Sequence, residues 1–327
     1  MTLGRRKEKL IRLPREWLFW AVLIICPAAG AQNAVPDLRG IYVYTTDIAQ
    51  LTNNEATTLS ASFGVPGVDG VAVTIGWAAL EPARGQFQWA TLDQWMGTAF
   101  AAGKKIDLVI PAGDRTPSWL FDPAPAGGGA RPLTFTVSNQ AKGNGVCKSE
   151  TVATPWDPAF IAEWDVMLAA VAAHLKSAGT YNALTLLRLT GINEMTEELR
   201  LPVETPQSTG LSCVTNSISL WQQAGYRPSL LLQGWSSILG SFQKSFPDKS
   251  FSLALIPFVA FPGIAENGSL INGTVPDRNQ PLLQLASQKL PGRLVIQFDS
   301  LLPGQPPEQE VIQAAQTLGT LAAYQTN

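Results

Sequence analysis

Short, nearly continuous apolar stretches recur along the chain and alternate with segments of helical periodicity. The strand-like stretches are 38–44, 68–77, 105–112, 184–192, 251–261, 293–298 and 320–325. Runs such as Val71-Ala72-Val73-Thr74-Ile75 are typical of strands in a parallel sheet that is covered on both faces. The pattern therefore predicts seven strands in one parallel sheet.

The segments between these stretches carry apolar residues at spacings of three and four. The clearest is 158–177, where Pro158 suits a first helical turn and Gly179 an end. Further helices are expected at 92–102, 229–246 and 308–318. The long segments 113–154 and 195–217, rich in Pro, Gly, Ser and Thr, are expected to be loops at the carboxyl ends of the third and fourth strands, where a barrel builds its site.

Alternating strands and helices predict either a closed barrel or an open, doubly wound sheet. We favour a TIM (β/α)8-type barrel, because no glycine-rich phosphate-binding loop follows an early strand. Only seven strands are found, and we expect the eighth to be missing at the C-terminus. A fragment of a longer reading frame is one explanation.

The N-terminal 31 residues have the features of an export signal. Basic residues precede a short apolar run at 17–26, and Ala29-Gly30-Ala31 fits a cleavage site. We expect a signal peptide at 1–31, a mature barrel domain at 32–327, and a secreted or periplasmic location. The run is shorter than the ~20 residues of a membrane span. An uncleaved anchor is the alternative, and no membrane association is expected after cleavage.

Composition excludes several classes of function. The formal net charge is −2, which argues against a nucleic-acid partner. Cys147 and Cys213 are the two cysteines of the predicted mature chain, and we expect a disulfide between them, with two free thiols as the alternative. The single histidine, His174, falls inside the apolar helix 158–177. Neither a Ser-His-Asp site, a transition-metal site nor a cofactor is expected, although an oxygen-only calcium site stays open.

Three stretches resemble retaining glycoside hydrolases of the (β/α)8-barrel clan, which includes the family 42 beta-galactosidases. The first runs from Val68 through Trp77-Ala78-Ala79-Leu80-Glu81-Pro82 to Leu92-Asp93. The second runs from Gly103 to Thr116-Pro117-Ser118-Trp119-Leu120, and the third is Thr190-Gly191-Ile192-Asn193-Glu194. The resemblance covers roughly residues 38 to 327 and implies a carbohydrate as the partner.

The third stretch gives the best catalytic candidate. Cleaving a glycosidic bond needs an acid to protonate the leaving oxygen and a second carboxylate to attack the anomeric carbon or activate water. The resemblance implies Glu194 as general acid/base and Asn193 as a hydrogen-bond partner of a sugar hydroxyl. At the tip of a buried strand the carboxyl pKa can rise toward neutrality. We expect Glu194 in an open cleft lined by Trp. Glu81 is expected to order the loop after the second strand.

The chain departs from the clan at the seventh strand, where the clan carries its nucleophilic Glu. Gln325 stands there instead. Either the register is misassigned, or the second carboxylate lies beyond residue 327, or the protein is inactive. Asp299, after the sixth strand, is equally a loop cap or a base. Aromatic candidates for sugar subsites, each with an alternative role in the core, are Tyr44, Trp77, Trp119, Trp156 and Trp235.

Two functional hypotheses remain. The first is an exported glycoside hydrolase that acts on a β-linked saccharide. The second is a degenerate or truncated barrel that binds carbohydrate without hydrolysing it. Asn193-Glu194 favours the first, and Gln325 with the missing eighth strand favours the second.

Overall fold

The computed structural model describes residues 38, 40–139, 146–194, 199–255, 261–272, 274–301 and 309–326. The predicted signal peptide lies outside these residues. The strands are β1 (Ile41–Asp47), β2 (Val68–Thr74), β3 (Lys105–Val109), β4 (Pro132–Ser138), β5 (Cys147–Ala153), β6 (Leu184–Arg188), β7 (Ser250–Leu255), β8 (Leu294–Leu301) and β9 (Leu321–Thr326). The helices are α1 (Asn53–Ser62), α2 (Trp77–Leu80), α3 (Ala90–Ala101), α4 (Pro158–Ser177), α5 (Pro206–Thr209), α6 (Ser217–Gln223), α7 (Pro228–Ser245), α8 (Asn279–Lys289) and α9 (Gln309–Leu318), with 3-10 turns η1 (Gly113–Arg115) and η2 (Ser118–Phe121).

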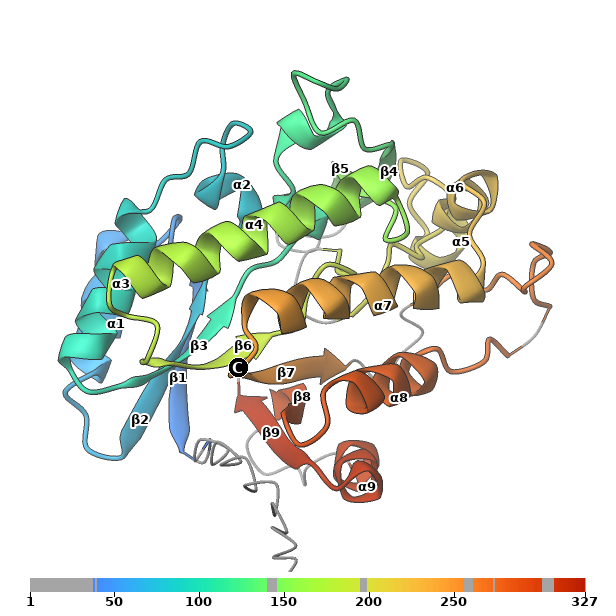
Figure 1. Ribbon diagram of the computed structural model, residues 1–327. Helices are drawn as coiled ribbons and strands as arrows, with labels where there is room; N and C mark the ends of the chain where they lie inside the picture. Colours follow the sequence, from blue (N-terminus) through green and yellow to red (C-terminus); the bar gives the residue numbers. More distant parts are fainter. Residues whose placement is uncertain are drawn as a thin grey trace, which may run out of the picture. The chain divides into compact units, whose positions relative to one another are not determined.

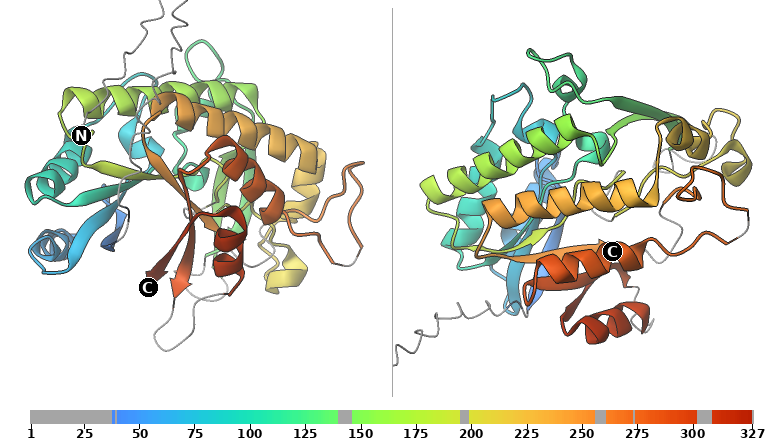
Figure 2. Two further views of the ribbon diagram at one scale, coloured as in Figure 1. Left: turned by 60° about the horizontal axis from the view of Figure 1, so that its bottom comes forward. Right: turned by 45° about the vertical axis from the view of Figure 1, so that its right-hand side comes forward.

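Seven strands form one parallel sheet in the order β1-β2-β3-β6-β7-β8-β9. All seven are the strands that the sequence predicts. The sheet curls as part of a barrel, and β1 and β9 are its two edges within the described residues (Figures 1 and 2). The fold is therefore an incomplete (β/α)8 barrel, which confirms the predicted fold class.

The strand register divides the sheet into an apolar face and a polar face, since paired residues of parallel strands share a face. The apolar face includes Val71, Val73, Ile106, Leu108, Leu187, Phe251, Leu253 and Ile296, all nearly fully buried in the core that the helices complete. The other face carries Tyr42, Ala72, Thr74, Asp107, Arg188, Ser252 and Gln297. Asp107 and Arg188 form a buried ion pair across β3 and β6, at 3.0 Å. The second face is thus the polar interior of the partial barrel.

Helices α4 and α7 run side by side over the apolar face (Figure 1). Asp157 caps α4 by accepting from the backbone N–H groups of Ala159 and Phe160, and Pro158 occupies the first turn, as predicted. Among the described helices only α4 is long and apolar enough to span a membrane. Its buried side chains, Trp164 and Met167 among them, belong to the same core as the sheet.

Part of the structure was not expected. The segment 113–154 contains the antiparallel hairpin β4–β5, with Phe135 opposite Glu150. Helix α1 begins with a capping box, in which Thr52 Oγ1 accepts from the Glu55 N–H and Glu55 accepts from the Thr52 N–H. That Thr-x-x-Glu spacing is visible in the sequence and is the signal that could have located α1.

Candidate active site at the carboxyl end of the sheet

The carboxyl ends of the parallel strands bring several polar residues together, because these ends all lie on the same side of the partial barrel. Glu194 follows β6, the fourth strand, and Asp47 ends β1. The turn η1 follows β3, and the Asp114 N–H donates to the Glu194 carbonyl oxygen at 2.8 Å. The ends of β3 and β6 are therefore joined at Glu194.

Gly113 makes this junction possible. Its φ is +55°, a left-handed conformation that favours glycine. A Cβ there would overlap the carbonyl oxygens of Asn193 and Glu194. The close approach of the two strand ends therefore requires glycine at this position.

Asn193 is buried and bonded to the backbone on both sides. Its Oδ1 accepts from the Ala112 N–H at 3.2 Å and from the Gly191 N–H at 3.0 Å. The side chain is 3% exposed. The amide oxygen thus fixes the strand ends relative to each other, which places Glu194. A hydrogen bond from Asn193 to a sugar hydroxyl stays a prediction.

Glu194 is almost completely enclosed. It is 2% exposed, so its side chain is not open to solvent as the expected cleft would require. Its Oε2 forms an ion pair with Arg200 Nη2 at 2.7 Å. Burial raises the pKa of Glu194 to about 7, the positive charge of Arg200 opposes that rise, and the negative charges of Glu150 and Glu204 add to it. The carboxyl is accordingly poised to give or take a proton near neutral pH.

Two further acidic side chains lie in this region and were not among the predicted site residues. Glu150 on β5 pairs with Lys148, and the Lys148 ammonium is also 3.5 Å from Asp114 Oδ2. Burial is the largest cause of the raised pKa of both Glu150 and Asp114. The alternating pattern of β5 could have revealed a strand, but not that the strand faces Glu194.

The end of β1 is held by an ion pair. Arg115 Nη1 lies 2.6 Å from Asp47 Oδ2, which also accepts from the Gly76 N–H at 3.3 Å. Tyr44, a predicted sugar contact, is half-buried on β1 next to Ala72 of β2. It therefore lies on the polar interior face, where a contact with a ligand stays a prediction.

Three of the predicted aromatic subsites are in the core instead. Trp77 and Trp235 have no exposed surface, and Trp119 is 6% exposed. Trp77 packs edge-on against Trp119 and Trp164, and Trp235 donates its indole N–H to the Leu282 carbonyl at 3.0 Å. Side chains enclosed in this way have no free ring face for a sugar, so the prediction of subsites at these three residues is wrong.

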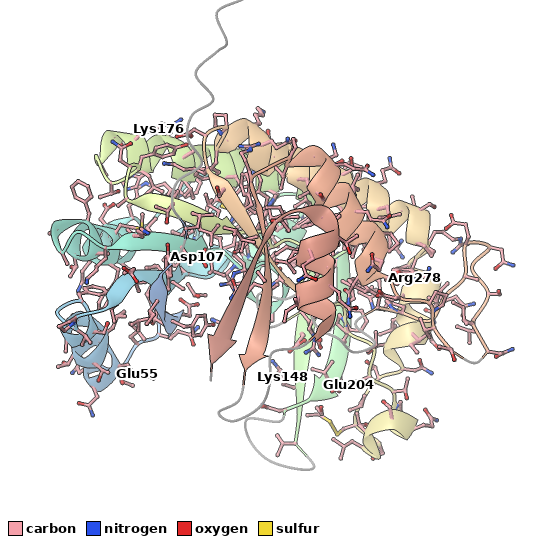
Figure 3. The ribbon with its side chains drawn as sticks, turned by 90° about the horizontal axis from the view of Figure 1, so that it is seen from below. Glu55, Asp107, Lys148, Lys176, Glu204 and Arg278 are labelled. Atoms are coloured by element: carbon pink, nitrogen blue, oxygen red, sulfur yellow. A yellow bond between two sulfur atoms is a disulfide. The ribbon has the colours of Figure 1, made fainter. Side chains whose placement is uncertain are left out.

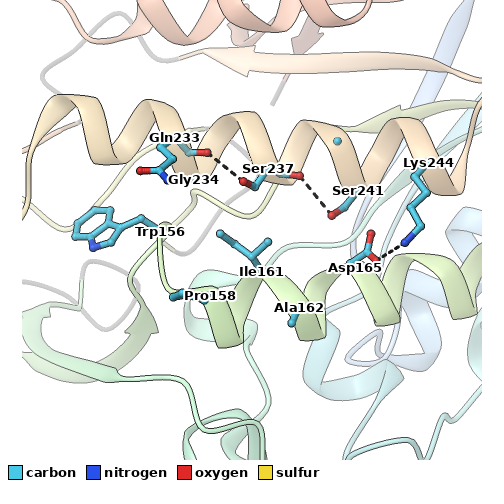
Figure 4. A pocket seen from close by; sticks show the side chains of 11 residues that line it. Trp156, Pro158, Ile161, Ala162, Asp165, Gln233, Gly234, Ser237, Ser241 and Lys244 are labelled. Atoms are coloured by element: carbon cyan, nitrogen blue, oxygen red, sulfur yellow. Dashed lines mark hydrogen bonds and ion pairs between the residues drawn. The ribbon is translucent and has the colours of Figure 1, made fainter.

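Trp156 lies beside a cavity of about 550 Å³ between α4 and α7 (Figure 4). The Asp165–Lys244 ion pair, at 2.7 Å, lies toward the other end of this cavity. The remaining lining residues are Pro158, Ile161, Ala162, Gln233, Gly234, Ser237, Gly240 and Ser241. Glu194 is not among them, so Trp156 and Glu194 do not share this cavity.

Glu81 orders the loop after β2, as the sequence predicts. Its carboxylate accepts from the Trp77 indole N–H at 2.9 Å and from the Gly85 N–H at 2.7 Å. Its carbonyl oxygen accepts from the Trp119 indole N–H at 2.8 Å. The Leu-Glu-Pro element is therefore a structural anchor rather than a source of the second carboxylate.

Two predicted positions are described only by their backbone. Asp299 lies in β8 and Gln325 in β9, and the side chains of both lie outside the described part of the structure. Among the described residues, no group of His, Cys, Asp and Glu side chains is arranged to hold a metal ion. His174 stacks on Trp89 at 4.1 Å and lies 2.6 Å from Asp93. It thus fastens α4 to α3.

The hairpin β4–β5 is tied to the loop before α6. Cys147 and Cys213 form a disulfide with a Cα separation of 6.3 Å. Glu204 accepts from the Ser138 N–H at 2.6 Å and from its hydroxyl at 2.5 Å. In Figure 3 the disulfide, Lys148 and Glu204 lie in the same part of the molecule. These ties hold the strand that carries Glu150 in place.

Part of the chain matches a known protein family. Residues 49–128 match the model of glycoside hydrolase family 42, described as Beta-galactosidase. This segment contains the Trp-x-x-Leu-Glu-Pro stretch and η2. No curated protein sequence matches the chain significantly.

Solved structures similar to this chain have low sequence identity to it. An intracellular xylanase from Thermoanaerobacterium saccharolyticum is 13% identical, with a TM-score of 0.52 over 88% of this chain and 72% of that one. A beta-galactosidase from the psychrophilic Marinomonas ef1 is 13% identical, with a TM-score of 0.48 over 84% of this chain. The chain spans 43% of the length of that enzyme. Residues 49–128 of the chain are thus similar to family 42 of the glycoside hydrolases, and the fold of the chain is an incomplete (β/α)8 barrel like that of the xylanase.

Proposed function

We propose that this protein is an exported glycoside hydrolase that cleaves a β-linked saccharide with Glu194 as its general acid/base. The observation that carries the proposal is a carboxyl group at the carboxyl end of the fourth parallel strand, buried, with a pKa of about 7. The family 42 match over residues 49–128 and the barrel fold support it. Export rests on the sequence features of residues 1–31.

In this mechanism the protonated Glu194 donates its proton to the glycosidic oxygen, which leaves as an alcohol when its bond to the anomeric carbon breaks. The resulting carboxylate then accepts a proton from the water whose oxygen bonds to the anomeric carbon. Because Glu194 is nearly enclosed, the substrate has to displace the side chain of Arg200, which is 30% exposed. Asn193 and Gly113 do not take part in the proton transfer. They hold in place the strand end that carries the Glu194 carboxyl group.

The test is turnover of aryl β-galactosides and aryl β-xylosides, classes suggested by the beta-galactosidase family description and the xylanase structure. Glu194→Gln should lower kcat by roughly 10²- to 10⁴-fold, the usual contribution of a general acid. The loss should be largest for substrates whose leaving groups are poor, since these depend most on protonation. Asp165→Asn, in a surface ion pair, is the matched control and should leave turnover unchanged. Equal loss with good and poor leaving groups would contradict the acid role.

A second candidate function is carbohydrate binding without hydrolysis. Gln325 in β9, at the position of the clan's nucleophile, favours it. Saturable binding of xylo- or galacto-oligosaccharides by calorimetry, without turnover of any aryl glycoside, would support this alternative over the first.

A further inference from the structure

Three cationic side chains lie at the carboxyl end of the sheet, and each is paired with a carboxylate that is more deeply buried than itself. The pairs are Arg200–Glu194, with side chains 30% and 2% exposed, Arg115–Asp47, at 31% and 5%, and Lys148–Glu150, at 28% and 1%. In all three pairs the cation is therefore the member that meets solvent, and its acid lies beneath it.

Asp114 joins these pairs into one cluster. Its carboxylate lies between Arg115 Nε, at 3.4 Å, and Lys148 Nζ, at 3.5 Å. Its N–H donates to the carbonyl oxygen of Glu194, the partner of Arg200. Acids outnumber cations in the cluster, so an approaching anion gains from direct contact with an outward cation rather than from a long-range field.

The guanidinium of Arg200 can form more contacts than it makes with the described residues. It carries five N–H donors in a planar fork. Among the described residues, the fork meets a carboxylate only through Nη2, which lies 2.7 Å from Glu194 Oε2. This contact is not aligned as a hydrogen bond, and the buried Oε2 has no hydrogen-bond partner in the described part of the chain. Both the fork and the carboxyl oxygen can therefore accept a new partner.

The proposed chemistry also removes the negative charge that Arg200 faces. A general acid has to be protonated before it acts, and a pKa of about 7 keeps Glu194 mostly protonated below neutral pH. Arg200 then lies against a neutral carboxyl group. An anionic group on the substrate would restore a charged partner, whereas a neutral sugar that displaces the guanidinium would leave it to water.

We propose that Arg200 is a specificity-determining residue that binds an anionic group of the substrate, so that the substrate is an acidic saccharide. A planar guanidinium matches a carboxylate, as in a uronic acid, through two parallel hydrogen bonds, and the oxygens of a sulfate ester can be bound in the same way. The inference rests on the proposed function for the choice of a saccharide, but anion binding at Arg200 can be measured without turnover.

The test compares sugars that differ only in the anionic group, at about pH 6 and low salt. The matched pairs are the aryl β-glucuronide with the aryl β-glucoside and the aryl β-galacturonide with the aryl β-galactoside, and an aryl β-galactoside 6-sulfate is the sulfate arm. Affinity by calorimetry, and kcat/KM where turnover occurs, should favour at least one acidic sugar over its neutral partner by roughly 10-fold or more, as a charge-assisted hydrogen bond provides. The preference should shrink as salt is added.

Variants of Arg200 identify the residue responsible. Arg200→Gln should weaken binding of the acidic sugar by about 10-fold and leave the neutral sugar little changed, which abolishes the preference. Arg200→Lys keeps the charge but loses the planar fork, so it should retain only part of the preference. The matched control is Lys244→Met, which removes the same unit of charge from the exposed pair with Asp165 and should leave the preference intact.

Equal affinity for both members of every pair, or no binding of any of these sugars, would overturn the inference, as would a preference that survives Arg200→Gln. If Arg200→Gln does not fold, Arg200→Lys decides, because an undiminished preference in that variant would also count against the role of Arg200. Selective binding of an acidic sugar without turnover of any glycoside would uphold the inference and refute the proposed hydrolase. Turnover of neutral and acidic glycosides without preference would do the reverse.

Discussion

Glu194→Gln should change how the stability of the protein depends on pH. An unfolded Glu ionises near 4.5, whereas the folded carboxyl does so at about 7. Between these values the folded state holds a proton that the unfolded state has released, so the free energy of unfolding falls as pH rises. At 1.36 kcal/mol per unit, that loss amounts to about 3 kcal/mol and is complete above pH ~8. The variant has no group there to ionise and avoids this loss.

The measurement is urea unfolding of both proteins, followed by tryptophan fluorescence from pH 4.5 to 8.5. The Gln variant need not be more stable in absolute terms, since its amide also weakens the contact with Arg200. The difference in unfolding free energy between variant and wild type should nevertheless rise by about 3 kcal/mol across the range. Asp165→Asn, in an exposed pair worth under ~1 kcal/mol, should show no such trend. A constant difference across the range would refute a raised pKa at Glu194.

Three further predictions concern the frame of the site. Gly113→Ala should destabilise the protein by about 2 kcal/mol or more and lower kcat, because the new Cβ pushes the Glu194 carbonyl away; unchanged melting would contradict the required close approach. The double variant Cys147→Ser/Cys213→Ser should have a free energy of unfolding lower by about 4 kcal/mol, because the disulfide no longer restricts the unfolded chain over a separation of 66 residues. Urea unfolding midpoints of variant and wild type under reducing and oxidising conditions check this value. Glu81→Ala should cost about 2–4 kcal/mol in urea unfolding, because two buried N–H donors lose their acceptor; a loss under ~1 kcal/mol would argue against the anchor role.

The sheet could be predicted because one face of each strand must be apolar to pack under the helices. The predicted ends were less accurate, since strand 68–77 ends at Thr74 and strand 184–192 ends at Arg188. The residues just past these ends, such as Ile75 and Leu189, are as deeply buried as the strands themselves. An apolar run marks burial, and burial continues into the turns that follow.

The site was only partly predictable. Glu194 was proposed because Asn193-Glu194 closes a buried strand and resembles the Asn-Glu pair of the glycoside hydrolase clan, a local signal, and its role stays a prediction. Trp77 and Trp235 were misassigned because an aromatic residue has the same appearance in a sequence whether its ring faces a core or a ligand. Glu150 was missed because its approach to Glu194 depends on how a hairpin folds back onto the sheet, a long-range arrangement that periodicity does not contain.

Burial explains both the raised pKa of Glu194 and why a substrate must displace Arg200 to reach its carboxyl group. Removal from water is the largest cause of its raised pKa, and Arg200, the group that closes over it, is the largest opposing influence. A sugar that displaces Arg200 would take away the charge that favours ionisation while keeping water out with its own ring. The carboxyl would then bind its proton most tightly in the presence of the leaving oxygen. In the hydrolase proposed above, the Arg200–Glu194 pair would therefore protect the acid while the site is empty, and substrate binding itself would complete the protonation that the reaction needs.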